Sequence, residues 1–101
     1  MIVAFSISPG GIGESVSDVV AGCVGIVRAS GLHNSTDSMF TTIEGDWDEV
    51  MAVIKACVDH VAERAPRVGL VLKADHRPGR HQTMADKIDA IERRLAPPPT
   101  S

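Results

Sequence analysis

Aromatic side chains are scarce in this sequence, which has no tyrosine, one tryptophan and two phenylalanines among its 101 residues. Its core must therefore be built from valine, isoleucine, leucine, alanine and methionine. A chain of this length buries only about 60–70% of its unfolded surface. We expect a single domain over residues 1–96 with a thin core, followed by a disordered proline-rich tail over residues 97–101.

The sequence also lacks an excess of positive charge. Its formal net charge is -3 and its pI is about 5.7, so no overall field attracts nucleic acid or an anionic membrane. The first residues, MIVAFSIS, contain neither the basic segment nor the long apolar stretch of a signal peptide or membrane span. We therefore expect a cytoplasmic protein with neither nucleic acid nor a membrane as a partner.

Cysteine is almost absent as well. Cys23 and Cys57 each lie among apolar residues at helical spacing, which is typical of reduced core thiols. A group of potential metal ligands near the C-terminus matches no established ligand spacing, and it comprises Asp75, His76, His81 and Asp86. The sequence predicts no disulfide, no metal site and no resident cofactor.

Hydrophobic patterning divides the first half of the chain into three elements. Alternation over residues 2–8 predicts a strand with one apolar face and one small, polar face. A glycine-rich turn and a capping box beginning at Ser15 then predict a helix over residues 15–30. Residues 33–37 indicate a short edge strand, and residues 39–44 indicate a further strand.

The second half contains two more helices and one strand. Asp46 and Glu49 form the pattern of a capping box, which predicts a helix over residues 46–64. Residues 68–74 are apolar nearly throughout, which is typical of a strand in the middle of a sheet. A last helix is expected over residues 83–95, with its apolar side chains on one face.

This order of elements predicts an α+β fold. Two strand-helix-strand halves in about 100 residues are typical of a ferredoxin-like βαββαβ sandwich, here with an additional C-terminal helix. Two helices then cover one face of a four-stranded sheet and leave the other face open. We expect that face to bind something or to pack on another subunit, which predicts a dimer or tetramer.

A polar cluster ends the strand over residues 39–44. Thr41, Thr42 and Glu44 offer hydroxyls and a carboxylate suited to an amino-bearing heterocycle or a cation. Strand alternation places Thr42 and Glu44 on one sheet face and Thr41 on the other. The alternative is that both threonines merely suit a sheet and that Glu44 pairs with Lys73.

The glycine-rich SPGGIGES turn is a second candidate. Its main-chain N–H groups could hold a small anion together with Arg77 or Arg80, although a tight turn explains the glycines equally well. No nucleophile motif surrounds Ser6, Ser8 or Thr42. The sequence therefore predicts no enzymatic activity.

Four segments resemble a family of small thiamine-binding proteins: MIVAFSISP with the glycine loop, SGL, MFTTIEGDWDEVMAVIK and APRVGLVLKADHRPG. The most specific part is the pattern T-x-E-G-x-W/F-D/E-E-[VI]-M, which begins at Thr42. The resemblance implies a ferredoxin-like domain that binds thiamine or its hydroxymethylpyrimidine part without catalysis, in dimers or tetramers. It implies ligand contacts at Ser6, Ser8, Thr41, Thr42, Glu44, Lys73 and Asp75.

Two other functions remain open at this point. One is a protein or enzyme that binds a small anion or phosphometabolite on the same scaffold. The other is a purely structural module whose open sheet face serves only to form oligomers.

Overall fold

The computed structural model describes residues 1–13, 16–79 and 83–97 of the chain. The elements in chain order are β1 (Ile2–Gly10), α1 (Val16–Ala29), β2 (Asn34–Thr36), β3 (Thr41–Glu44), α2 (Trp47–Ala62), β4 (Arg67–Asp75) and α3 (Met84–Leu95). This is the order that the sequence predicts. Ser15, Arg80 and His81, which carried predictions above, lie outside the described residues, as do residues 98–101 of the predicted tail.

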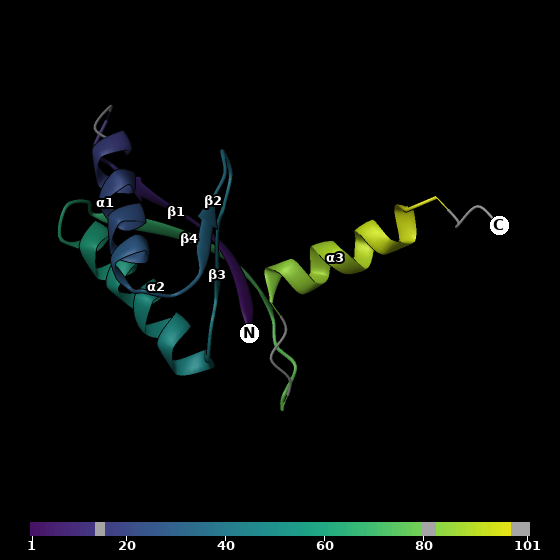
Figure 1. Ribbon diagram of the computed structural model, residues 1–101. Helices are drawn as coiled ribbons and strands as arrows, with labels where there is room; N and C mark the ends of the chain where they lie inside the picture. The colour runs from purple at the N-terminus through teal and green to yellow at the C-terminus, as the bar shows by residue number, and fades with distance from the viewer. Residues whose placement is uncertain (14–15, 80–82, 98–101) are drawn as a thin grey trace.

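The four strands form one sheet in the order β2-β3-β1-β4, and each adjacent pair is antiparallel. Both α1 and α2 lie on the same side of this sheet, whereas α3 extends away from it (Figure 1). The ferredoxin-like α+β class and the additional C-terminal helix are therefore confirmed.

The core lies between the sheet and the two covering helices. Alternate residues of β1 face it, because successive side chains of a strand point to opposite faces. The most completely buried side chains are Ile43, Ile54, Val3, Val27, Val50, Val61, Cys23 and Cys57. Apart from the two thiols these are all aliphatic, as the scarcity of aromatic residues predicted.

Strand register decides which residues share the open face. Ile2 lies between Glu44 of β3 and Asp75 of β4, and Ala4 lies between Thr42 and Lys73. Because Val3, Phe5 and Ile7 face the core, these two rows belong to the opposite face.

The prediction that residues 68–74 form a central strand is wrong, because β4 is an edge strand. Leu70, Val71 and Leu72 are 42%, 61% and 36% exposed. An apolar run on both faces indicates burial on both sides, but in the part of the chain that the structure describes only β1 pairs with this strand. The pattern therefore reports a surface that this chain alone does not bury.

The strand predicted over residues 39–44 begins two residues later, at Thr41. The Asp37 main-chain N–H donates to the Phe40 carbonyl at 2.9 Å, and the Asp37 carboxylate accepts from the Met39 and Phe40 N–H groups at 2.8 and 2.9 Å. These bonds hold residues 37–40 as the turn of the β2–β3 hairpin.

The starts of α2 and α3 are capped differently. Asp46 is the N-cap residue of α2, but its side chain makes no capping hydrogen bond and stays exposed to solvent. The box predicted with Glu49 is therefore wrong. At α3, Thr83 Oγ1 accepts from the Asp86 N–H at 3.0 Å and the Asp86 carboxylate accepts from the Thr83 N–H at 3.2 Å.

Candidate functional site

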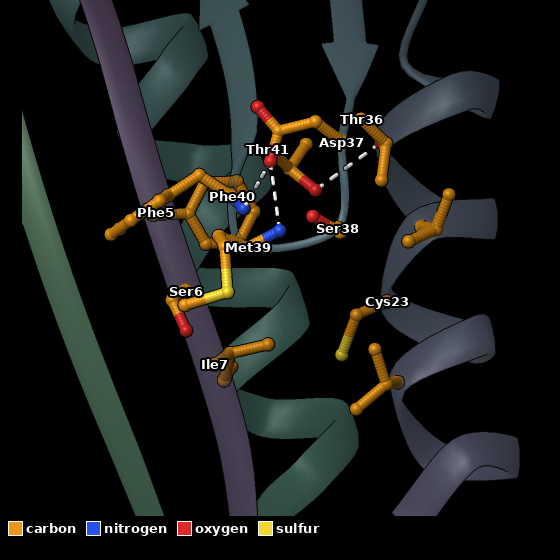
Figure 2. Close-up of a pocket in the computed structure, with 12 residues that line it drawn as sticks. Phe5, Ser6, Ile7, Cys23, Thr36, Asp37, Ser38, Met39, Phe40 and Thr41 are labelled. Carbon is orange, nitrogen blue, oxygen red and sulfur yellow. Dashed lines mark hydrogen bonds between the residues drawn. The ribbon is translucent and has the colours of Figure 1, made fainter.

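A cavity of about 110 Å³ lies where β1 runs past the end of the β2–β3 hairpin. One side of the cavity comes from β1, α1 lies opposite, and the hairpin turn closes one end (Figure 2). The lining residues are Phe5, Ser6, Ile7, Val20, Cys23, Val24, Thr36, Asp37, Ser38, Met39, Phe40 and Thr41. The site therefore combines an apolar interior with a group of polar side chains.

The polar side of the cavity comes from the hairpin. Thr36 and Thr41 face each other across it, with their hydroxyl oxygens 3.3 Å apart. The N–H groups of Phe40 and Met39 hold the pKa of the Asp37 carboxyl below its usual range. Asp37 is exposed, so it presents a negative charge beside the cavity at neutral pH.

The helix side of the cavity is apolar and uncharged. The Cys23 thiol donates to the Cys57 carbonyl and the Cys57 thiol donates to the Cys23 carbonyl, at 3.7 and 3.5 Å. Burial raises the pKa of the Cys23 thiol, and burial together with the neighbouring Cys23 raises the pKa of Cys57 to about 12. Both thiols are free and buried, as the sequence predicts, and their raised pKa values keep them protonated at neutral pH.

Of the seven residues predicted to contact a ligand, Ser6 and Thr41 line the cavity. Thr41 faces the helices and is 8% exposed, while Thr42 and Glu44 lie on the open face, as alternation predicted. Ser6 borders the cavity, although strand alternation directs its side chain to the open face together with those of Ser8, Thr42, Glu44, Lys73 and Asp75. The set is thus divided between the two sides of the sheet.

Two of the open-face acids hold the start of α3. The Glu44 carboxylate accepts from the Met84 N–H at 2.6 Å, and Asp75 forms an ion pair with Lys87. This ion pair holds the pKa of the Asp75 carboxyl below its usual range. The alternative pairing of Glu44 with Lys73 does not occur among the described residues.

The glycine turn and Arg77, the described parts of the suggested anion site, do not come together. The glycine turn adjoins the beginning of β4, since Gly10 pairs with Arg67 and a Cβ on Gly11 would lie 2.7 Å from Pro66 Cγ. Arg77 follows the other end of the same nine-residue strand. Positive φ angles of 83° and 67° at Gly11 and Gly13 account for the glycines as turn residues.

Two other features are absent from residues 1–13, 16–79 and 83–97. No group of three or more histidine, cysteine, aspartate or glutamate side chains there is arranged to hold a metal ion. His76 packs edge-on against Trp47, with ring centroids 5.5 Å apart. Nor is any helix in that part of the chain long and apolar enough to cross a membrane.

The sequence matches a protein family described as thiamine-binding protein over residues 3–92. The chain belongs to this family. The UPF0045 protein Mb1933 of Mycobacterium bovis is 52% identical over 99 residues, which cover 97% of each chain. The UPF0045 protein sll0230 of Synechocystis is 40% identical, over 91% of this chain and 77% of the relative.

Two solved structures of other proteins have the same fold as this thiamine-binding family member. The protein MJ1052 of Methanocaldococcus jannaschii has 33% sequence identity and a TM-score of 0.81, over 90% of this chain and 94% of the other. A Thermotoga maritima protein with a proposed role in thiamine biosynthesis or salvage has 21% identity and a TM-score of 0.78, over 89% and 96% of the two chains. At that identity the second likeness concerns the fold alone.

Sequence reasoning missed most of the cavity lining. It placed Met39 and Phe40 in a strand and assigned no role to Asp37 or Ser38, although the segment STDS contains residues that favour turns. Interpreting that segment as a hairpin turn would have placed polar groups beside β1. The contribution of α1 had no such signal, because Val20 and Val24 look like ordinary core residues.

Proposed function

We propose that this protein binds thiamine or its hydroxymethylpyrimidine part as a homo-oligomer, without catalysing a reaction, and that the ligand's pyrimidine ring enters the cavity beside the β2–β3 hairpin. Membership in the thiamine-binding protein family over residues 3–92 carries the choice of ligand. The cavity supports the choice of site, because it combines apolar walls with hydroxyls and a carboxylate.

The size of the cavity limits what enters it. A protein cavity of roughly 150 Å³ holds benzene, so a cavity of about 110 Å³ takes one six-membered ring with an edge at the mouth. Thiamine has two rings, and its cationic thiazolium ring would stay outside. Asp37, exposed and ionised at the cavity, then supplies a compensating negative charge.

Titration calorimetry with thiamine and with free hydroxymethylpyrimidine tests the function. We expect both to bind with one site per chain, and the smaller molecule to retain affinity within about tenfold of thiamine because it fills the same cavity. Absence of heat with both compounds at millimolar concentration would refute the proposal. Conversion of more than one equivalent of either compound per chain would refute its non-enzymatic part.

Thr41 and Thr42 provide a matched pair of variants for locating the site. The two residues are adjacent in sequence, but Thr41 faces the cavity and Thr42 faces the open side of the sheet. We expect Thr41→Val to weaken binding of both compounds and Thr42→Val to leave it unchanged. The reverse result would move the site to the open face, where Ser8, Lys73 and Asp75 also lie.

A further inference from the structure

The strand β1 is paired along its whole length on one side only. It pairs with β4 from Ile2 to Gly10, but with β3 only from Ile2 to Phe5. Beyond Phe5 the hairpin turns away, because residues 37–40 are held in their own turn. The second half of β1 therefore has an open main-chain edge, and this edge forms part of the cavity wall.

Hydrogen bonds at the start of β1 show which residues present their main chain to this edge. The Met1 amino group donates to the Gly45 carbonyl at 2.9 Å and the Gly45 N–H donates to the Met1 carbonyl at 3.1 Å, so Met1 points toward the β3 side. The direction alternates along a strand, and the register contains no bulge. The odd-numbered residues of β1 thus point toward β3 and the even-numbered ones toward β4.

Pro9 independently supports this alternation, in which the main-chain groups of odd-numbered β1 residues point toward β3. Proline has no N–H to donate, and within a sheet it is accepted where that position faces an open edge. Pro9 is paired in register with Val68 of β4, and its odd number directs its nitrogen away from that strand. A proline in the opposite phase would remove a hydrogen bond between β1 and β4.

This alternation directs the main-chain groups of Ile7 toward the cavity. Its side chain is 9% exposed and faces the core, while its main-chain N–H and C=O point toward the space that β3 leaves empty. Within the described residues, no hydrogen bond to either group is present on that side. A donor and an acceptor are thus presented together beside an apolar cavity.

We propose that the main-chain N–H and C=O of Ile7 recognise the ligand's ring, as a short substitute for the missing strand. The matching chemistry is a planar heterocycle with a ring-nitrogen acceptor next to an exocyclic amino donor. The Ile7 N–H donates to the ring nitrogen and the amino group donates to the Ile7 carbonyl. This inference rests on the proposed function, and it extends that function from thiamine to 4-aminopyrimidines in general.

Ligand analogues provide the first test. We expect 4-amino-2-methylpyrimidine to bind, and the analogue that lacks the amino group to bind about five- to 150-fold more weakly, since an unmade buried hydrogen bond costs about 1–3 kcal/mol. Equal affinity of these two compounds would overturn the assignment to Ile7 and leave thiamine binding intact. Failure of thiamine itself to bind would instead refute the proposed function.

A change of the main chain provides a second test. Cys23 follows Gly22, so a synthetic segment 1–22 can be joined to residues 23–101 by native chemical ligation to give the full chain. Replacing the amide between Ser6 and Ile7 by an ester removes the Ile7 N–H and keeps every side chain. We expect affinity for thiamine to fall about tenfold, whereas an ester at Val3, whose N–H points to β3, leaves affinity unchanged in the folded protein.

Hydrogen exchange is measured in the unmodified protein, so its result does not depend on whether the ester variants fold. In the free protein the Ile7 amide should exchange faster than the Val3 and Phe5 amides, which point to β3 where that strand is present. Saturation with thiamine should slow the Ile7 amide at least about tenfold. An unchanged rate at Ile7 in the saturated protein would overturn the inference.

Discussion

Asp37 combines a structural and an electrostatic contribution at the scale of a single residue. Its carboxylate accepts the Met39 and Phe40 N–H groups and thereby shapes the hairpin turn, while its charge remains exposed beside the cavity. An asparagine side chain retains an oxygen that can accept the same two bonds. Asp37→Asn therefore separates the charge from the turn.

We expect Asp37→Asn to weaken thiamine binding about two- to fivefold at low ionic strength, the usual size of an exposed charge pair. Binding of neutral hydroxymethylpyrimidine should not change, because only thiamine carries the thiazolium cation. Calorimetry with both compounds is the measurement. Asp46→Asn is the control, since Asp46 lies beyond the other end of β3; equal effects of the two substitutions would contradict a local role.

Gly22 allows close packing of α1 on α2. A Cβ at this position would lie 2.7 Å from Cε1 of the His60 ring and closer still to Nε2, an atom that is already buried. We expect Gly22→Ala to lower the free energy of unfolding by about 1–3 kcal/mol through this overlap. Urea denaturation measures the change.

Gly25 on the same helix is the matched control. It is exposed and an added Cβ would meet nothing within 4 Å, so Gly25→Ala should stabilise the protein by about 0.5–1 kcal/mol through helix propensity. Adding His60→Ala to Gly22→Ala should remove the overlap. Equal stability of the two single alanine variants would show that the His60 ring moves away without cost.

Cys57 makes stability depend on pH in the alkaline range. Its pKa is raised in the folded protein from 9.0 to about 12, so folding favours the protonated thiol. The contribution is complete below about pH 9, the pKa of the unfolded thiol, and is lost as the pH rises toward 12. We expect the denaturant midpoint of unfolding to fall over this pH range, and to fall less in Cys57→Ala. Equal pH dependence of the midpoint in the two proteins would contradict this role of Cys57.

At the scale of elements, α3 is held at its beginning and is free along its length. Glu44 and Asp75 bind its first turns, while Ile88, Ile91 and Leu95 are 58%, 57% and 72% exposed. None of its residues is buried. The amphipathic pattern of α3 therefore predicts the helix correctly, but the apolar face of α3 covers no surface of the described chain.

We expect Glu44→Ala to increase amide exchange in the first turn of α3, because the substitution removes the acceptor of the Met84 N–H. Exchange in the core of β1 should remain slow, since Glu44 lies outside the core. Glu49→Ala, at another exposed acid, is the control. Unchanged exchange in α3 would show that something other than Glu44 holds the helix.

At the scale of the whole molecule, apolar surfaces remain uncovered on α3 and on β4. The phase established for β1 directs the main chain of the even-numbered residues of β4, such as Leu70 and Leu72, away from β1 and toward an open edge. An exposed edge strand of nine residues with an apolar centre is a ready surface for pairing with another chain. These features support the proposed homo-oligomer.

Light scattering should therefore give the mass of a dimer or tetramer of the 10.7 kDa chain. Val71→Glu should shift the protein toward the monomer, because Val71 is 61% exposed and its replacement places a charge on the open face. Ala52→Glu, on the exposed side of α2, should leave the mass unchanged. A stable wild-type monomer at micromolar concentration would refute the proposal.

The sequence by itself determined the kind and order of the elements. Periodicity of 2 in β1 and of 3.6 in the helices depends only on which face of each element is buried. Local signals also act without long-range contacts: Thr83 with Asp86 starts α3, and Gly31, at a φ of 79°, follows the end of α1. Alternation also placed Thr41 and Thr42 on opposite faces correctly.

Only the tertiary structure decided where the site lies. The cavity exists because β1 continues beyond the end of β3 and α1 crosses the gap, and no local pattern encodes that difference in length. The same holds for β4, whose apolar run predicted a central strand although the chain places it at an edge. Burial of a strand depends on its neighbours in the sheet, and those neighbours come from distant segments.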